Sequence, residues 1–335
     1  MSTVEEIEHA CGSVGPVRPA RHAVEPPDLD FEKMLYPYGF PASIRTNSEE
    51  ILEQLTEMWG KFERQHKTEP ILVDVQLVES ASEECPPEPT YRVMMPLMMC
   101  VADRDNYGIA DLDRCCARIT VSTAALRHPL YAQYFLLGMP VSCVATNFAT
   151  PIHAGCVSLH GRGILLCGDS GAGKSTLSYA CARSGWTYVS DDASFLLNGG
   201  TERLVTGNCH QVRFRPSAGE LFPEIQGLEI TPRAAGKPSI EMPTAAMPHI
   251  ACAQTTRVDS IVFLNRRSGD SQQLLPYRRD VARQFMRQVL FGSAVSLVVQ
   301  YEAIERLLTA EIFELRYRDL DWAVDRLRTL AESGR

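Results

Sequence analysis

The second half of the chain alternates short apolar runs with longer stretches in which apolar residues recur at helical spacing. Residues 164–167 form a continuous apolar run typical of a buried strand, and a glycine-rich segment separates this run from a predicted helix at residues 174–184. Further strand-like runs follow at residues 186–190, 258–265 and 311–317, and further helices are predicted near 278–293, near 297–309 and at the C-terminus. Strands that alternate with helices predict an α/β domain, which we place at residues 140–335.

The first half has a different pattern. Apolar residues recur at helical spacing from Ile51 to Phe62, after a helix start predicted at Asn47 and Glu50. Two strands are predicted at residues 71–78 and 91–101, a turn at 105–108 leads into a third, and a helix at 128–138 is predicted to begin at Pro129 and end at Gly138. We therefore predict a small α+β domain at residues 36–139, preceded by a flexible, proline-containing leader at residues 1–35.

Composition narrows the class of protein. Hydrophobic residues make up 45% and charged residues 22% of the chain, which is ordinary for a globular protein, and the net charge of -8 argues against a general nucleic-acid binder. The eleven cysteines have no recurring spacing, so we expect reduced thiols and neither a disulfide framework nor a zinc site. Without a signal-peptide pattern or a membrane-length apolar run, the expected location is the cytoplasm, with no membrane partner.

The segment between the predicted strand and helix carries the clearest chemistry. Its sequence, Gly-Asp-Ser-Gly-Ala-Gly-Lys-Ser, matches the Walker A pattern G-x-x-x-x-G-K-[ST], whose backbone N–H groups cradle phosphates at the start of a helix. Lys174 is placed to reach the β- and γ-phosphates of a nucleotide, and the Ser175 hydroxyl is placed to ligate Mg²⁺. The predicted nucleotide-binding residues are Gly168, Asp169, Ser170, Gly171, Ala172, Gly173, Lys174, Ser175 and Thr176.

Phosphoryl transfer also needs a metal site and a group that takes the acceptor's proton. Asp191 and Asp192 end the strand at 186–190, where open α/β sheets bind ligands, so one carboxylate could ligate Mg²⁺ with Ser175 while the other acts as base. Such a pair also commonly caps a helix or faces solvent. His153 is a candidate catalytic residue, and an ordinary core or surface histidine is the alternative.

Basic residues downstream are candidates for binding phosphate or an acidic substrate. Arg213 and Arg215 alternate on a predicted strand, so both guanidinium groups would share one face, which could equally be a solvated face. Lys237 is a further candidate for the same role.

Two segments, residues 153–175 and 186–193, resemble the catalytic core of HPr kinase/phosphorylase, in which a histidine precedes the phosphate loop and an Asp-Asp pair ends the next strand. The resemblance implies a P-loop-containing domain akin to that of phosphoenolpyruvate carboxykinase, which uses ATP and Mg²⁺ to phosphorylate a serine hydroxyl, and it suggests a homo-oligomer. It also implies that Lys174 and the loop bind phosphates, that Ser175 and Asp192 bind the metal, and that Asp191 is the acid/base which His153 assists.

The sequence departs from that family at two places. Thr176 stands where the bifunctional enzymes usually have Glu, and residues 212–223 stand in place of their Arg-Gly-Leu-Gly-Ile signature for phosphorolysis. These departures favour the HPr-kinase-related kinases, some of which phosphorylate the C-terminal serine of a lasso peptide. The predicted function is therefore a serine kinase acting on a protein or peptide, without phosphorylase activity. The alternatives are a small-molecule hydroxyl kinase and a nucleotide-sensing regulator without catalysis, which would have no need for both aspartates and the histidine.

Overall fold

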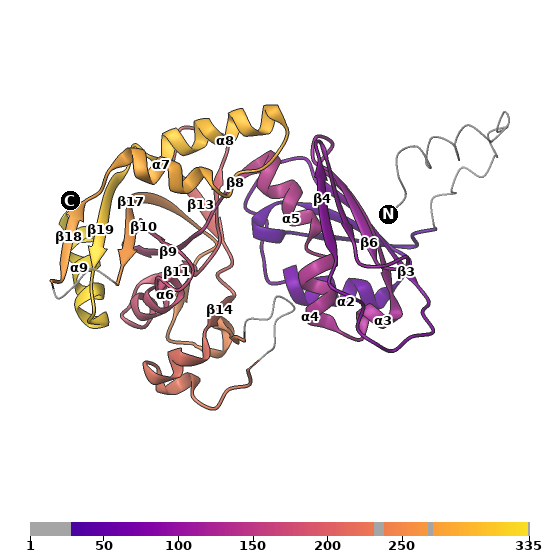
Figure 1. Ribbon diagram of the computed structural model, residues 1–335, viewed down its shortest axis with the longest axis horizontal. Coiled ribbons are helices and arrows are strands. Elements are labelled where there is room, and N and C mark those ends of the chain that lie inside the picture. The colour runs from indigo at the N-terminus through magenta and orange to yellow at the C-terminus, as the bar shows by residue number, and fades with distance from the viewer. Residues whose placement is uncertain (1–27, 231–237, 267–270, 334–335) are drawn as a thin grey trace, which may run out of the picture.

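The computed structural model describes residues 28–230, 238–266 and 271–333. The two large sheets of the described chain lie in separate halves of the molecule, the first formed by β1–β7 and the second by strands from β8 onward (Figure 1). The predicted leader falls mostly outside the described residues, and its last part is wrong as a leader because Phe31–Leu35 forms strand β1. β1 pairs with the next strand through Leu35 and Ala42, both of which are buried.

The sheet of the first half has seven strands in the order β1-β2-β3-β7-β6-β5-β4. β3 pairs in parallel with both β2 and β7, and the other neighbours are antiparallel, so this sheet is mixed. Its strands are β1 (Phe31–Leu35), β2 (Ala42–Thr46), β3 (Ile71–Val78), β4 (Thr90–Met94), β5 (Leu97–Val101), β6 (Tyr107–Asp111) and β7 (Cys116–Ser122).

Helices of the first half complete its core. In α2 (Glu49–Trp59), Ile51, Leu55 and Trp59 recur at helical spacing, and they pack in one cluster with the buried alternate residues of β3. The remaining helical segments are η1 (Pro37–Gly39), α3 (Thr123–Leu126), α4 (Pro129–Tyr131), the π-helix η2 (Ala132–Leu136), α5 (Met139–Cys143) and the π-helix η3 (Val144–Phe148).

Three local predictions in the first half are corrected. The strand expected at 91–101 is a hairpin of β4 and β5, because Met95 and Pro96 form a turn inside the apolar run. The helix expected at 128–138 is not one regular α-helix, since α4 passes into the π-helix η2. The residue that caps α2 is Ser48, whose hydroxyl accepts a hydrogen bond from the backbone N–H of Ile51.

The sheet of the second half has the strand order β16-β11-β9-β10-β17-β13-β12-β8, with β19 and β18 attached beside β17. β10 pairs in parallel with β17, which pairs in parallel with β19, while β9 is antiparallel to β10. Its strands are β8 (Ala149–Ile152), β9 (Ala154–Leu159), β10 (Arg162–Cys167), β11 (Thr187–Ser190), β12 (Ser194–Leu197), β13 (Leu204–Gly207), β16 (Ala251–Cys252), β17 (Thr255–Asn265), β18 (Gln273–Pro276) and β19 (Glu311–Arg316). A separate two-stranded antiparallel sheet pairs β14 (Gln211–Phe214) with β15 (Ile240–Pro243).

Helices cover both faces of this second sheet, with α7 and α8 on one side and α6 and α9 on the other (Figure 1). Strand β10 is buried on both faces, since Ile164 and Leu166 pack in one core cluster and Leu165 and Cys167 in the other. This explains why the strand is continuously apolar and does not alternate. The helical segments are α6 (Lys174–Arg183), α7 (Arg279–Arg287), α8 (Ala294–Leu307), α9 (Leu320–Ser333), and the short 3-10 helices η4 (Pro216–Glu220), η5 (Pro223–Ile225) and η6 (Thr244–Ala246).

The two halves contact each other through Tyr38. Its carbonyl oxygen accepts a hydrogen bond of 3.0 Å from the Thr206 hydroxyl, and its ring centroid lies 4.6 Å from that of Phe195. The core of the first half includes Ala149 and Phe195, which lie on strands of the second half. The division into domains at residue 140 stays a prediction. Within the described ranges, none of the helices has both the length and the apolar character needed to cross a membrane.

Candidate active site

The segment that matches the Walker A pattern, which we call the phosphate loop for its predicted role, joins the carboxyl end of β10 to the first turn of α6. The sequence predicts this arrangement of strand, loop and helix. Gly173 precedes the helix with a φ of 99°, a left-handed conformation that residues with a Cβ rarely adopt. A Cβ at this position would also lie 3.0 Å from the hydroxyl oxygen of Tyr317. The loop therefore keeps its shape because glycine occupies this position, and the free N–H groups at the start of α6 border the loop.

Lys174 is buried although it is charged. Its side chain is 4% exposed, and Nζ donates hydrogen bonds of 2.9 Å to the Gly168 carbonyl and to Nε2 of His153. Oδ1 of Asp192 lies 3.7 Å from Nζ. Burial lowers the pKa of Lys174, while the charge of Asp192 opposes this shift.

His153, between β8 and β9, lies beside this lysine. Because an ammonium group can only donate, Nε2 of His153 accepts, and the neutral ring carries its proton on Nδ1. Nδ1 is 3.6 Å from Oδ1 of Asp192. Burial and the positive charge of Lys174 lower the pKa of His153, so the ring is neutral at neutral pH.

Asp191 and Asp192 follow β11 and lie in different environments. Asp191 is buried, and its Oδ2 accepts a hydrogen bond of 2.9 Å from the backbone N–H of Arg213. Burial raises the pKa of Asp191 from 3.8 to about 6, against lowering contributions from Arg213 and from a hydrogen bond of the Ser175 hydroxyl. The side chain of Asp192 is half exposed and faces Lys174 and His153.

One cavity of about 670 Å³ gathers most of the predicted residues, and we call it the phosphate cavity. His153 and both aspartates line it together with part of the loop, namely Ser170, Gly171, Gly173, Lys174, Ser175 and Thr176. The other predicted loop residues, Gly168, Asp169 and Ala172, line a neighbouring cavity of about 280 Å³, which shares Ser170, Gly171 and Arg266 with the phosphate cavity. Described residues from seven separate segments thus line one cavity at the carboxyl end of β10.

The downstream basic residues have different positions. Arg213 and Arg215 both line the phosphate cavity, but only Arg213 lies on the strand, because β14 ends at Phe214. The side chain of Arg213 pairs with Glu241, with Nε 3.0 Å from Oε1, whereas Arg215 is exposed. Lys237 lies outside the described residues.

Arg266 and Tyr134 line the phosphate cavity, and sequence reasoning did not single out either of them. Arg266 follows β17, the parallel neighbour of β10, and its guanidinium carbon lies 5.8 Å from the ring centroid of Tyr317. Its place after the carboxyl end of a parallel strand was the available signal. Tyr134 comes from η2 in the other half, and no local sequence pattern indicates that contact.

A magnesium ion fits the side chains present. The described residues include no group of three or more His, Cys, Asp or Glu side chains that could hold a metal ion by themselves. Mg²⁺ that binds with nucleotide phosphates usually takes only one or two carboxylates from the protein. Ser175 and Asp192 offer a hydroxyl and a carboxylate at one cavity, which are oxygen ligands of the kind that mode of binding uses.

The sequence matches no protein-family model and no curated protein. Among solved structures, the chain is similar to the Hpr(Ser) kinase/phosphatase from Coxiella burnetii, with a TM-score of 0.32 and 12% sequence identity over 55% of this chain and 99% of that one. A likeness this distant identifies neither the fold family nor the activity, and what the structure gives is a mixed α/β protein with parallel and antiparallel strand pairs.

Proposed function

We propose that this protein is an ATP- and Mg²⁺-dependent kinase that transfers the γ-phosphate to a serine hydroxyl of a protein or peptide. The observation that carries the proposal is a single cavity bordered both by the buried lysine of a phosphate loop and by a buried carboxyl with a raised pKa. The loop side supplies phosphate binding, and the carboxyl side supplies proton transfer. On this proposal the second half is a P-loop domain of the HPr kinase/phosphoenolpyruvate carboxykinase type in an oligomeric, cytoplasmic enzyme.

Phosphate binding is assigned to the loop and to Lys174. The backbone N–H groups after β10 would bind the phosphate oxygens, and the Lys174 ammonium would turn from the Gly168 carbonyl to the β- and γ-phosphates. Arg266 stands at the same cavity with an exposed guanidinium and would contact the phosphates as well. Ser175 and Asp192 would hold the magnesium ion, which when bound neutralises phosphate charge.

Asp191 is assigned the role of base. The acceptor hydroxyl oxygen forms a bond to the γ-phosphorus, the bond from that phosphorus to the β–γ bridging oxygen breaks with its electron pair leaving on ADP, and the hydroxyl proton passes to Asp191. With a pKa of about 6 the carboxyl is ionised at neutral pH and still basic enough to take this proton. The Arg213 N–H fixes Oδ2, so the carboxyl is held in one orientation.

His153 and Asp192 are assigned to support Lys174. The neutral His153 ring accepts from Lys174 through Nε2 and turns Nδ1–H toward Asp192, so the three groups form one connected set. This set holds the ammonium at the cavity wall before nucleotide binds. Residues 212–223, which occupy the place of the phosphorolysis signature, supply Phe214, Ser217 and Leu221 to the cavity, and we propose that the reverse, phosphorolytic reaction is absent.

The test is label transfer from γ-labelled ATP, with Mg²⁺ and candidate serine peptides or proteins. We expect Asp191→Asn to lower the transfer rate by about 10²–10⁴-fold, the usual contribution of a general base, while binding of a fluorescent ATP analogue persists. The matched control is Asp259→Asn, since Asp259 pairs with Arg257 and lines neither the phosphate cavity nor its 280 Å³ neighbour. A normal rate of phosphate transfer by Asp191→Asn would show that Asp191 is not the base. ATP binding without transfer to any acceptor would favour the alternative function, a nucleotide-sensing regulator without catalysis.

A further inference from the structure

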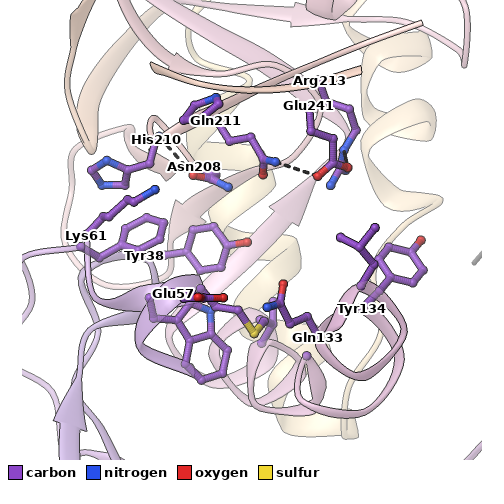
Figure 2. Close-up of a pocket in the computed structure, with 17 residues that line it drawn as sticks. Tyr38, Glu57, Lys61, Gln133, Tyr134, Asn208, His210, Gln211, Arg213 and Glu241 are labelled. Atoms are coloured by element: carbon purple, nitrogen blue, oxygen red, sulfur yellow. Dashed lines mark hydrogen bonds and ion pairs between the residues drawn. The ribbon is translucent and has the colours of Figure 1, made fainter. Parts of the chain in front are cut away.

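A second cavity, of about 510 Å³, lies between the two halves of the molecule, and we call it the interlobe cavity (Figure 2). The first half contributes Tyr38, the end of α2 and the π-helix η2, and the second half contributes β14 and β15. Its size is in the range of cavities that hold drug-sized ligands, and binding sites are common at interfaces between lobes.

This cavity adjoins the phosphate cavity. Tyr134 and Arg213 line both of them. Arg213 also donates its backbone N–H to Asp191, so the strand that borders the interlobe cavity holds the proposed base directly. A molecule in the interlobe cavity would therefore lie next to the site of phosphoryl transfer.

The charges around the interlobe cavity are balanced, which selects against a polyanionic ligand. Its lining has two carboxylates, Glu57 and Glu241, and two permanent cations, Lys61 and Arg213. Both oxygens of Glu241 are engaged, since Arg213 Nε donates to Oε1 at 3.0 Å and Gln211 Nε2 donates to Oε2 at 2.7 Å. The part of the lining formed by Arg213, Gln211 and Glu241 therefore has no net charge and is held by its own hydrogen bonds. A nucleotide or nucleic acid would find no excess of positive charge there.

Other polar groups of the lining have no hydrogen-bond partner in the described part of the chain. They include the side-chain amide of Gln133 and the hydroxyl of Tyr38, both of which point into the cavity in Figure 2. Asn208 uses its Oδ1 for the His210 backbone N–H, and its NH₂ group has no partner among these residues. An amide side chain offers a donor and an acceptor together, which matches the alternating C=O and N–H groups of a peptide backbone.

Tyr38 is held in place at a conformational cost. Its φ of 53° and ψ of 24° are left-handed, which is uncommon for a residue with a large side chain. Aromatic contacts with Phe195 and Phe62, at centroid distances of 4.6 and 5.4 Å, fix the ring with its hydroxyl toward the cavity. Strained backbone of this kind clusters at functional sites, and here it orients a residue of the interlobe cavity.

We propose that the interlobe cavity binds the peptide segment beside the acceptor serine, with Gln133 and Tyr38 bonding its backbone and Tyr134 at the passage to Asp191. This inference rests on the proposed kinase function and names its substrate class as an extended peptide of uncharged or charge-balanced residues. Gln133 and Tyr38 are substrate-positioning residues, because they line the interlobe cavity but not the phosphate cavity.

The experiment uses a library of serine peptides in which each flanking position is varied in turn, with γ-labelled ATP and the full chain. For the best peptide, we expect Gln133→Leu and Tyr38→Phe each to raise the peptide KM by about 3–10-fold, the effect of one lost hydrogen bond. We expect kcat and the Kd of the fluorescent ATP analogue to stay within about twofold. Gln284→Leu is the matched control, because Gln284 is an exposed amide on α7 that lines neither cavity.

A second measurement does not depend on catalysis. The best peptide is synthesised with a benzophenone amino acid beside the serine, and the irradiated complex is digested and mapped by mass spectrometry. Cross-links at residues 130–138 or at Tyr38 would support the proposal. If the peptide is labelled but Gln133→Leu leaves its KM unchanged and the cross-links fall elsewhere, this inference is overturned while the kinase function stands. ATP binding with no labelled and no cross-linked peptide would overturn both.

Discussion

Replacement of Asp191 by asparagine should stabilise the protein at neutral pH while it removes the proposed base. Asp191 is 9% exposed, and burial raises its pKa from 3.8 to about 6. Because the folded-state pKa is the higher one, the folded state binds the proton more tightly than the unfolded state does. Binding of this proton therefore contributes to the free energy of unfolding. The contribution is complete below about pH 4 and is lost as the pH rises through about 6.

The size of the effect follows from the two pKa values. A pKa difference of one corresponds to about 1.36 kcal/mol, so the ionised Asp191 lowers the free energy of unfolding by about 3 kcal/mol at pH 8 and by about 1 kcal/mol at pH 4.5. Asparagine stays neutral and can still accept the hydrogen bond from the Arg213 N–H through its side-chain oxygen. We therefore expect Asp191→Asn to exceed the wild type by about these amounts at each pH.

Urea unfolding followed by tryptophan fluorescence measures this difference, since Trp59 and Trp186 are buried in the cores of the two halves. Asp192→Asn is the control, and because its side chain is half exposed we expect a change below about 1 kcal/mol. If the difference in unfolding free energy between Asp191→Asn and wild type did not grow from pH 4.5 to pH 8, or if it had the opposite sign, that result would refute the reasoning. The rate of label transfer by the wild type should rise through about pH 6 and then level off.

Two further predictions concern the phosphate loop. Gly173→Ala should lower the free energy of unfolding by more than the roughly 1–2 kcal/mol of left-handed strain, and it should weaken binding of the ATP analogue, because the new Cβ meets Tyr317. Gly185→Ala is the control, since Gly185 has a φ of 87° and no atom within 4 Å of the added Cβ, so this variant should show the strain alone. Equal losses of unfolding free energy in the two variants, measured in urea, would contradict this prediction. Lys174→Met keeps the apolar stem of the side chain but loses the ammonium group. The Kd of the ATP analogue, measured by fluorescence titration, should therefore rise by about tenfold or more. An unchanged Kd would exclude Lys174 from phosphate binding.

Local signals in the sequence were enough for the elements that carry the phosphate loop. The apolar run of β10, the left-handed glycine at 173 and the helical stretch after Lys174 are all encoded within about 20 residues, and the structure confirms this strand, loop and helix. The strands at 187–190, 255–265 and 311–316 were also found, since short buried strands have a recognisable pattern. Where the local signals competed, as in the apolar run that hides the turn at Met95 and Pro96, the prediction was wrong.

What the sequence determined by itself is thus a strand, a glycine-rich loop and a helix, followed by a pair of aspartates at the end of a second strand. Only the tertiary structure decided that Asp191 is buried and Asp192 half exposed, because the burial of Asp191 depends on Arg213 and the β14–β15 sheet, which lie far along the chain. The same holds for Arg266 and Tyr134, which reach the phosphate cavity through strand order and through the packing of the two halves. Periodicity and motif spacing are properties of neighbouring residues, whereas a cavity is made by residues that folding brings together from distant segments.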